Sequence, residues 1–145
     1  MKTTPTIYSV HGRILSITGT DPAAGAEISE VVPSLRRWRI LAVRFAFVTD
    51  ATVADRLVHL HIDDGVNTFA DICVTTAHQA SVTKTYNFSN FGSTQLNPAN
   101  CLYIPLPPLP LSPGFRIRTA TDLIEAGDDF GAPQLLVEEW IDPTS

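Results

Sequence analysis

The chain has 145 residues, of which 44% are hydrophobic and 17% are charged, and its formal net charge is −5. This length indicates one domain that can bury its own core, and the low charged content argues against disorder. The negative charge argues against binding to duplex DNA, because the densest basic cluster is only Arg36, Arg37 and Arg39. We expect these arginines on the outer face of a strand or in ion pairs.

No apolar segment approaches the roughly 20 residues that a membrane span requires. The first residues, MKTTPTIYSVHG, lack the apolar centre of a signal peptide. The sequence therefore predicts a protein that is made in the cytoplasm and stays soluble until it assembles, with no membrane partner.

A polar start, residues 1–6, indicates a flexible N-terminal arm, and residues 7–145 are expected to form the single domain. The pattern that follows predicts short strands at residues 7–10, 13–18 and 26–32. A proline directly after the third strand is expected to end it.

The stretch from Trp38 to Ile62 predicts a long β-hairpin that the rest of the domain covers. Its first arm, Trp38–Val48, is rich in aromatic and β-branched residues, which suit a buried pleated surface. Its second arm, Arg56–Ile62, alternates apolar and polar side chains. The residues between the arms have turn chemistry, and Asp63-Asp64-Gly65 closes the second arm.

The second half of the chain predicts five more strands. These are residues 67–74 with a possible bulge, 81–88, 101–104, 114–119 and 134–141. Between them, residues 89–100 form a long polar loop, of a length that often has a functional or interfacial role. A turn-rich connection is expected at 121–131, where a short helical turn is possible.

About eight to ten short strands, without a sustained helical apolar stripe, predict an all-β fold. We expect an antiparallel β-sandwich of the jelly-roll type, although the strand count also fits an immunoglobulin-like sandwich. The alternating positions predict the core. Its expected members are Trp38, Val43, Phe45, Val58, Leu60, Ile62, Phe115, Ile117, Leu135 and Val137.

One segment, His59-x-His61-x-Asp63-Asp64, has a spacing typical of metal sites, because alternate strand residues share a face. Two histidines alone rarely hold a metal tightly, and the sequence offers no further ligand at a plausible spacing. We therefore expect exposed or cross-strand-paired histidines and no metal site. The segment Asp63-Asp64-Gly65-Val66-Asn67 lacks the donors of a calcium loop and predicts a hairpin turn.

No catalytic constellation is apparent, so the sequence predicts neither an enzyme nor a cofactor. There is no GxSxG motif and no phosphate loop. The acidic pairs Asp128-Asp129 and Glu138-Glu139 are expected in a turn and on opposite faces of a strand, respectively. Cys73 and Cys101 have no metal-binding spacing, so we expect two buried free thiols, although a disulfide between them is possible.

The tract PLPPLPLSP, residues 105–113, has the PxxP spacing of ligands for SH3-type domains. Strands are predicted on both sides of it, and leucines occur throughout. We therefore expect a rigid connection that its leucines anchor to the domain, and that could also form part of an oligomer contact.

Several segments together resemble a known class of protein. These are the strand pair RRWRILAVRFAFVTDATVADR with HLHIDDG, then TYNFS, PLPPLPLSPGFRIRTAT and LIEAGDDFGAPQLLVEEWI. From residue 33 to residue 141 the chain resembles small β-sandwich virion structural proteins of tailed bacteriophages. The resemblance implies a capsid decoration (cement) protein or a tail-associated protein, made in the host cytoplasm and located in the virion. It supplies no functional residues.

The expected partner of a decoration protein is the major capsid protein, bound as a repeating lattice by a homo-oligomer, with a trimer as the first expectation. The arm 1–6 and the loop 89–100 are candidate lattice contacts. The alternative is a tail or fibre module that binds a host glycan. Such a site needs an exposed aromatic platform, and the candidates Trp38 and Trp140 both lie in predicted strands and are expected to be buried.

Overall fold

The computed structural model describes residues 12–91 and 100–142. The predicted arm 1–6, the predicted strand 7–10 and most of the predicted loop 89–100 lie outside the described residues. The described residues are all-β. None of them forms a helix long and apolar enough to cross a membrane.

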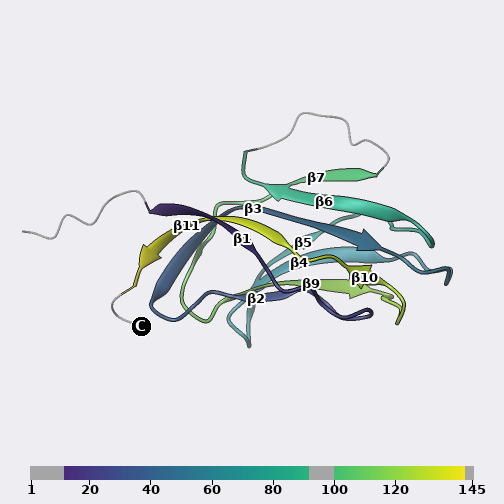
Figure 1. Cartoon of the computed structure of the whole chain (residues 1–145), viewed down its shortest axis with the longest axis horizontal. Coiled ribbons are helices and arrows are strands. Elements are labelled where there is room, and N and C mark those ends of the chain that lie inside the picture. The colour runs from purple at the N-terminus through teal and green to yellow at the C-terminus, as the bar shows by residue number, and fades with distance from the viewer. Residues whose placement is uncertain (1–11, 92–99, 143–145) are drawn as a thin grey trace, which may run out of the picture.

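The strands of the described residues form two packed sheets (Figure 1). The larger sheet contains β1 (Arg13–Thr18), β3 (Arg36–Val48), β6 (Thr83–Ser89), β7 (Cys101–Pro105), β8 (Pro110–Leu111), β10 (Asp129–Phe130) and β11 (Gln134–Ile141). The smaller sheet contains β2 (Ser29–Val31), β4 (Leu57–Asp63), β5 (Thr68–Cys73) and β9 (Arg116–Asp122). All pairs are antiparallel except β6 with β7.

Eight of these strands have the order of a jelly roll, β1-β11-β3-β6 in one sheet and β2-β9-β4-β5 in the other. The order arises from one long antiparallel hairpin rolled into two sheets. Its turn joins β4 to β5, and the successive pairs outward are β3 with β6, β2 with β9 and β1 with β11. The predicted jelly-roll sandwich is confirmed.

The predicted hairpin of residues 38–62 is wrong in its pairing, although both arms are strands. β3 lies in the larger sheet and β4 in the smaller one, so residues 49–56 cross between sheets. Both strands are apolar on one face because they cover the same core from opposite sides. Their facing apolar patterns resemble those of a pair of hairpin arms, and alternation alone does not distinguish the two arrangements.

The central strand β3 contains a β-bulge, and the burial of its side chains changes phase at that point. Trp38 and Ile40 are buried at even positions, whereas Val43 and Phe45 are buried at odd positions. The pairing with β11 shifts between these two sets, which leaves Leu41 as the extra residue. The bulge lets one strand of 13 residues keep its apolar side chains on the same face throughout.

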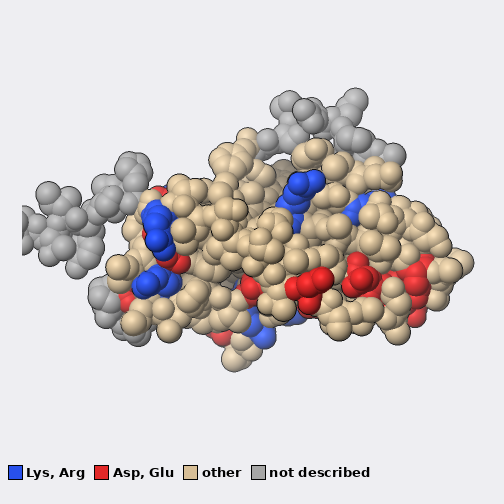
Figure 2. Space-filling model, viewed as in Figure 1, with Lys and Arg blue, Asp and Glu red and all other residues tan. Residues whose placement is uncertain are grey.

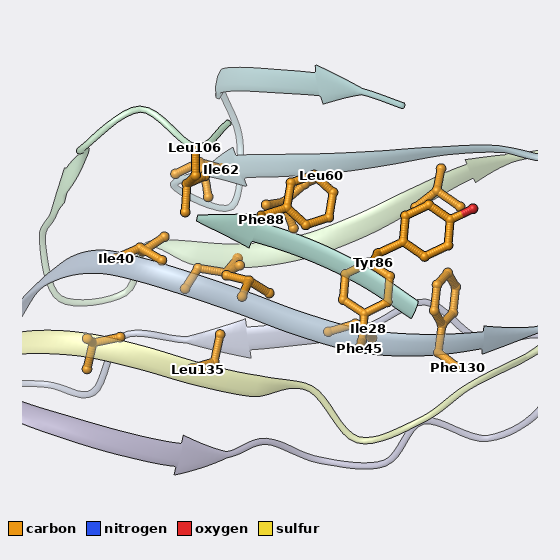
Figure 3. Packing of buried hydrophobic residues seen from close by; sticks show 14 of the residues in the cluster. Ile28, Ile40, Phe45, Leu60, Ile62, Tyr86, Phe88, Leu106, Phe130 and Leu135 are labelled. Atoms are coloured by element: carbon orange, nitrogen blue, oxygen red, sulfur yellow. The ribbon is translucent and has the colours of Figure 1, made fainter. Parts of the chain in front are cut away.

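The core lies between the sheets and is rich in aromatic rings (Figure 3). Phe45 stacks on Tyr86 with ring centroids 5.4 Å apart, and Phe47 stacks on Phe130 at 4.1 Å. Nine of the ten predicted core residues are buried, and Phe115 is only partly buried at the edge of the core.

The proline tract is packed on the domain as predicted. Leu106 and Leu111 are buried, and Leu109 packs against the core. Pro110 and Leu111 form β8, which pairs with Arg39 and Trp38 at the start of β3. The tract is therefore held by both side chains and backbone, which does not suit a free ligand for an SH3-type groove.

Candidate functional site

The outer face of the smaller sheet gathers the two histidines of β4 with an aspartate of β5. His59 and His61 point away from the core with ring centroids 5.8 Å apart, and Asp71 lies directly opposite His61. One oxygen of Asp71, Oδ1, lies 2.7 Å from Nδ1 of His59 and 3.2 Å from Nε2 of His61. The three side chains thus bring one donor atom each to within 4.8 Å of one another.

A second carboxylate approaches this cluster from β9. Oδ2 of Asp122 lies 3.4 Å from Nε2 of His59, within ion-pair distance but without hydrogen-bond geometry. Burial lowers the pKa of His59, but the carboxylates of Asp71 and Asp122 outweigh burial and leave that pKa above its ordinary value. The imidazole of His59 therefore lies between two carboxylates, one near each of its nitrogens.

The other polar residues of the predicted segment lie elsewhere. Asp63 is buried and accepts hydrogen bonds from Nε of Arg116 and Nε of Arg118. Burial alone would raise the pKa of Asp63. The hydrogen bonds from the two arginines outweigh burial and lower this pKa to about 2. Asp64 accepts hydrogen bonds from the backbone of the β4–β5 turn, including that of Asn67, as the hairpin interpretation requires. Neither aspartate belongs to the histidine cluster.

The premise that the histidine pair lacks further ligands at plausible spacing is wrong. Asp71 is separated from the pair by a turn, and Asp122 follows His61 by 61 residues; strand pairing brings both next to the pair. The one sequence signal for Asp71 is its place in the hairpin that follows the pair. For Asp122 the sequence holds no such signal, because only the fold sets β9 beside β4.

The cysteines are both free, and Cys73 is exposed rather than buried. Cys73 is paired with His59 in the β4–β5 ladder, but Nδ1 of His59 is hydrogen-bonded to Asp71. Burial of the Cys73 sulfur raises the thiol pKa, and the charges of Asp71 and Asp122 raise it further. The thiol is therefore protonated near neutral pH and poorly suited to nucleophilic chemistry.

The acidic pairs have structural surroundings. Glu138 contacts Arg39, and Glu139 accepts a hydrogen bond from Nε1 of Trp38. They are consecutive residues of β11 and lie on its opposite faces, as predicted. In the pair Asp128-Asp129, the sequence predicted a turn, but it did not predict that Asp128 is fully buried.

The partner of Asp128 is Arg56, which is also fully buried. Nε and Nη2 of Arg56 donate to the two carboxylate oxygens of Asp128 at 2.9 and 3.0 Å. Arg56 also donates to Asp50 and to the carbonyls of Thr52 and Ala54. This network joins residues 49–56, which connect the two sheets, to the turn before β10. Because the buried guanidinium and the carboxylate of Asp128 are paired with each other, we infer a structural role.

A buried histidine, His78, also has a complete set of partners. Its Nε2 lies 2.8 Å from the carbonyl of Val82, which can only accept, so Nε2 carries the proton. Its Nδ1 then accepts a hydrogen bond from the hydroxyl of Tyr86 at 2.9 Å. Burial lowers the pKa of His78. The neutral ring therefore serves as a core hydrogen-bonding group.

Trp140 is only partly buried, contrary to expectation, whereas Trp38 is buried as predicted. The guanidinium of Arg39 lies over the ring of Trp140, 5.3 Å from its centroid. The ring of Trp140 is therefore already stacked against a side chain, which disfavours a sugar platform.

The predicted ion pairs of the basic cluster are present. Arg36 pairs with Glu139, Arg37 with Asp142 and Arg39 with Glu138.

The surface also holds a shallow apolar pocket of about 250 Å³ at the edge of the core, lined by Ile62, Phe69, Leu109, Pro110, Leu111 and Phe115. The lining residues are apolar, with Phe69 stacked on Phe115 at 5.3 Å. The pocket therefore offers contact area but no groups for chemistry.

Comparison with protein-family models gave no match, and comparison with curated proteins gave no significant similarity.

Proposed function

We propose that the protein is a structural component of a tailed-phage virion, a capsid decoration (cement) protein that binds the major capsid protein lattice and is not an enzyme. The proposal rests on the resemblance of residues 33–141 to such proteins and on two exposed leucines at opposite ends of the sandwich. Leu35 directly precedes β3, and Leu123 directly follows β9.

These leucines support the proposal because both side chains are exposed and both residues have a positive φ angle. Leu35 is 46% exposed with φ of 60°, and Leu123 is 65% exposed with φ of 58°. Residues with a side chain rarely adopt positive φ, and glycine or asparagine would do so at lower cost. An apolar side chain kept at such a position without burial is expected to contact something outside the chain.

Leu35 has an exposed apolar neighbour, and an exposed valine lies in the connection at the end of the sandwich that holds Leu123. Ile141 is 72% exposed and precedes Asp142, whose backbone N–H donates to the carbonyl of Leu35. Val53, 91% exposed, lies in the connection that leads to Leu57, the residue paired with Asp122 beside Leu123. The two groups flank β3, whose 13 residues extend over about 40 Å.

Two apolar groups so far apart suit a protein that bridges neighbouring subunits. The ends also differ in charge. Figure 2 shows several Asp and Glu side chains close together in the half of the molecule that holds β10, whereas at the β1 end the basic side chains lie beside acidic ones. We expect a homo-oligomer, with a trimer as our first expectation, because a repeating lattice multiplies modest individual contacts.

The test is to add purified protein to phage shells that lack it and to count bound copies per shell by quantitative mass spectrometry. We expect hundreds of copies, and far weaker binding to an isolated capsid subunit. A few copies per particle would instead indicate a tail position. Specific glycan binding by the free protein without any shell association would replace the proposal with the glycan-binding alternative.

Asparagine substitutions separate surface contact from folding. Asn tolerates positive φ, so Leu35→Asn and Leu123→Asn are expected to leave stability unchanged or raised while lowering the copy number. Ser81→Asn is the matched control, because Ser81 is also exposed with φ of 57°. Unchanged copy numbers in both leucine variants would exclude these ends as the contact surfaces.

A further inference from the structure

The cluster on the outer face of the smaller sheet has the donor spacing of a metal site. Ligands of a tetrahedral Zn²⁺ with bonds of about 2.0–2.1 Å lie about 3.3 Å apart. Oδ1 of Asp71 lies 2.7 Å from Nδ1 of His59 and 3.2 Å from Nε2 of His61. All three atoms lie within 4.8 Å of one another, so we infer that side-chain rotations can place them around one ion.

The hydrogen bonding of the cluster leaves one nitrogen of each ring without a partner. Nε2 of His59 and Nδ1 of His61 are buried atoms with no hydrogen-bond partner. If the neutral rings carry their protons on Nδ1 of His59 and Nε2 of His61, both can donate to Asp71. Nε2 of His59 then has no proton and faces the carboxylate of Asp122, which also can only accept. A cation on Nδ1 moves the proton of His59 to Nε2, where it can be donated to Asp122.

We propose that His59 Nδ1, His61 Nε2 and Asp71 Oδ1 bind one divalent transition-metal ion, and that Asp122 positions His59 from behind. A carboxylate that accepts the second N–H of a metal-bound histidine fixes the ring and raises its basicity. Asp122 lies 3.4 Å from the nitrogen that this arrangement requires. This inference goes beyond the proposed virion role and does not depend on it.

The donor set indicates which ions fit. Two imidazoles and one carboxylate suit Zn²⁺, Co²⁺ and Ni²⁺, and they do not suit the oxygen-binding Ca²⁺ or Mg²⁺. The neighbouring charges also allow a cation. Arg118 lies opposite His61 on β9, but its guanidinium is bound to Asp63.

Bound metal would connect β4 to β5 directly and to β9 through Asp122. Each of these strands is already paired with its neighbour by backbone hydrogen bonds. The ion would add a side-chain link across the solvent face of the sheet. We therefore expect binding to stabilise the fold rather than to be required for it.

The experiment is titration of tag-free, full-length protein with Zn²⁺ in a calorimeter, together with thermal unfolding with and without Zn²⁺. We expect one equivalent bound and a higher Tm. His61→Ala and Asp71→Asn should each weaken binding by more than about 100-fold and abolish the Tm rise. Asp122→Asn should weaken it by about 10–100-fold, as loss of an outer carboxylate does.

Asp129→Asn is the matched control, because it removes an exposed carboxylate from β10 in the other sheet and should leave binding unchanged. Circular dichroism checks that each variant is folded, and His61→Gln replaces His61→Ala if that variant is not. Absence of stoichiometric binding to the wild-type protein, or equal binding by the Asp71→Asn variant, would overturn the proposal.

Discussion

Replacing Asp128 by alanine should destabilise the domain more than almost any other single change to a polar residue. Four hydrogen bonds end on this carboxylate, two from Arg56 and one each from the backbone N–H groups of Asp50 and Glu125. Burial raises the pKa of Asp128, but these donors, Arg56 foremost, hold it below its ordinary value. The carboxylate is therefore charged in the folded protein.

The magnitude follows from what the substitution leaves behind. The side chain of Arg56 is fully buried, and its remaining carboxylate partner, Asp50, is 27% exposed. Removing one partner of a buried ion pair typically costs about 3–5 kcal/mol, because the other charge stays buried without compensation. Domains are usually stable by only about 5–15 kcal/mol, so this loss is a large part of the total.

The assay is urea unfolding at neutral pH, with Asp129→Ala as the control for loss of an adjacent, exposed carboxylate. The control should change the free energy of unfolding by less than about 0.5 kcal/mol. Adding Arg56→Met to Asp128→Ala removes the orphaned charge and should recover part of the loss. A loss below about 1 kcal/mol for Asp128→Ala, or no recovery in the double variant, would refute the reasoning.

Three further outcomes are expected from the core. Leu60→Ala should cost about 2–5 kcal/mol in urea unfolding, because Leu60 is fully buried; a cost near zero would contradict its position in β4. Tyr86→Phe should cost about 1–3 kcal/mol, since it leaves Nδ1 of His78 without its donor, and an unchanged midpoint would argue against that hydrogen bond. The lowered pKa of His78 means that the unfolded chain binds its proton first. Stability should therefore fall as pH drops through about 6.5, and His78→Gln should flatten this slope between pH 7 and 5; an equal slope in wild type and variant would exclude His78 as the cause.

The sequence predicted the strands well but not all of their partners. Alternation in residues 56–62 and 134–141 identified β4 and β11 to within a residue or two. Which strand lies beside which depends on the rolling of the whole hairpin, and a local pattern does not contain that information. The pairing of β3 with β6, across the intervening β4–β5 hairpin, was therefore missed.

The candidate site shows the same division. The shared face of His59 and His61 follows from the two-residue period of a strand and was predicted. The contributions of Asp71 and Asp122 depend on register in two neighbouring strands. Asp128 was missed for a related reason, because a turn-like sequence between glycines does not reveal that a distant arginine is buried against it.

The rolled hairpin also has a kinetic consequence. Contacts near its turn are local, since His59 and Asp71 are 12 residues apart, whereas Arg13 and Glu139 are separated by 126 residues. Closing longer loops costs more entropy, so folding is expected to begin at β4–β5, to end with β1 joining β11, and to take milliseconds to seconds. A core truncation in β4 should then slow refolding, whereas one at Ile17 in β1 should mainly accelerate unfolding.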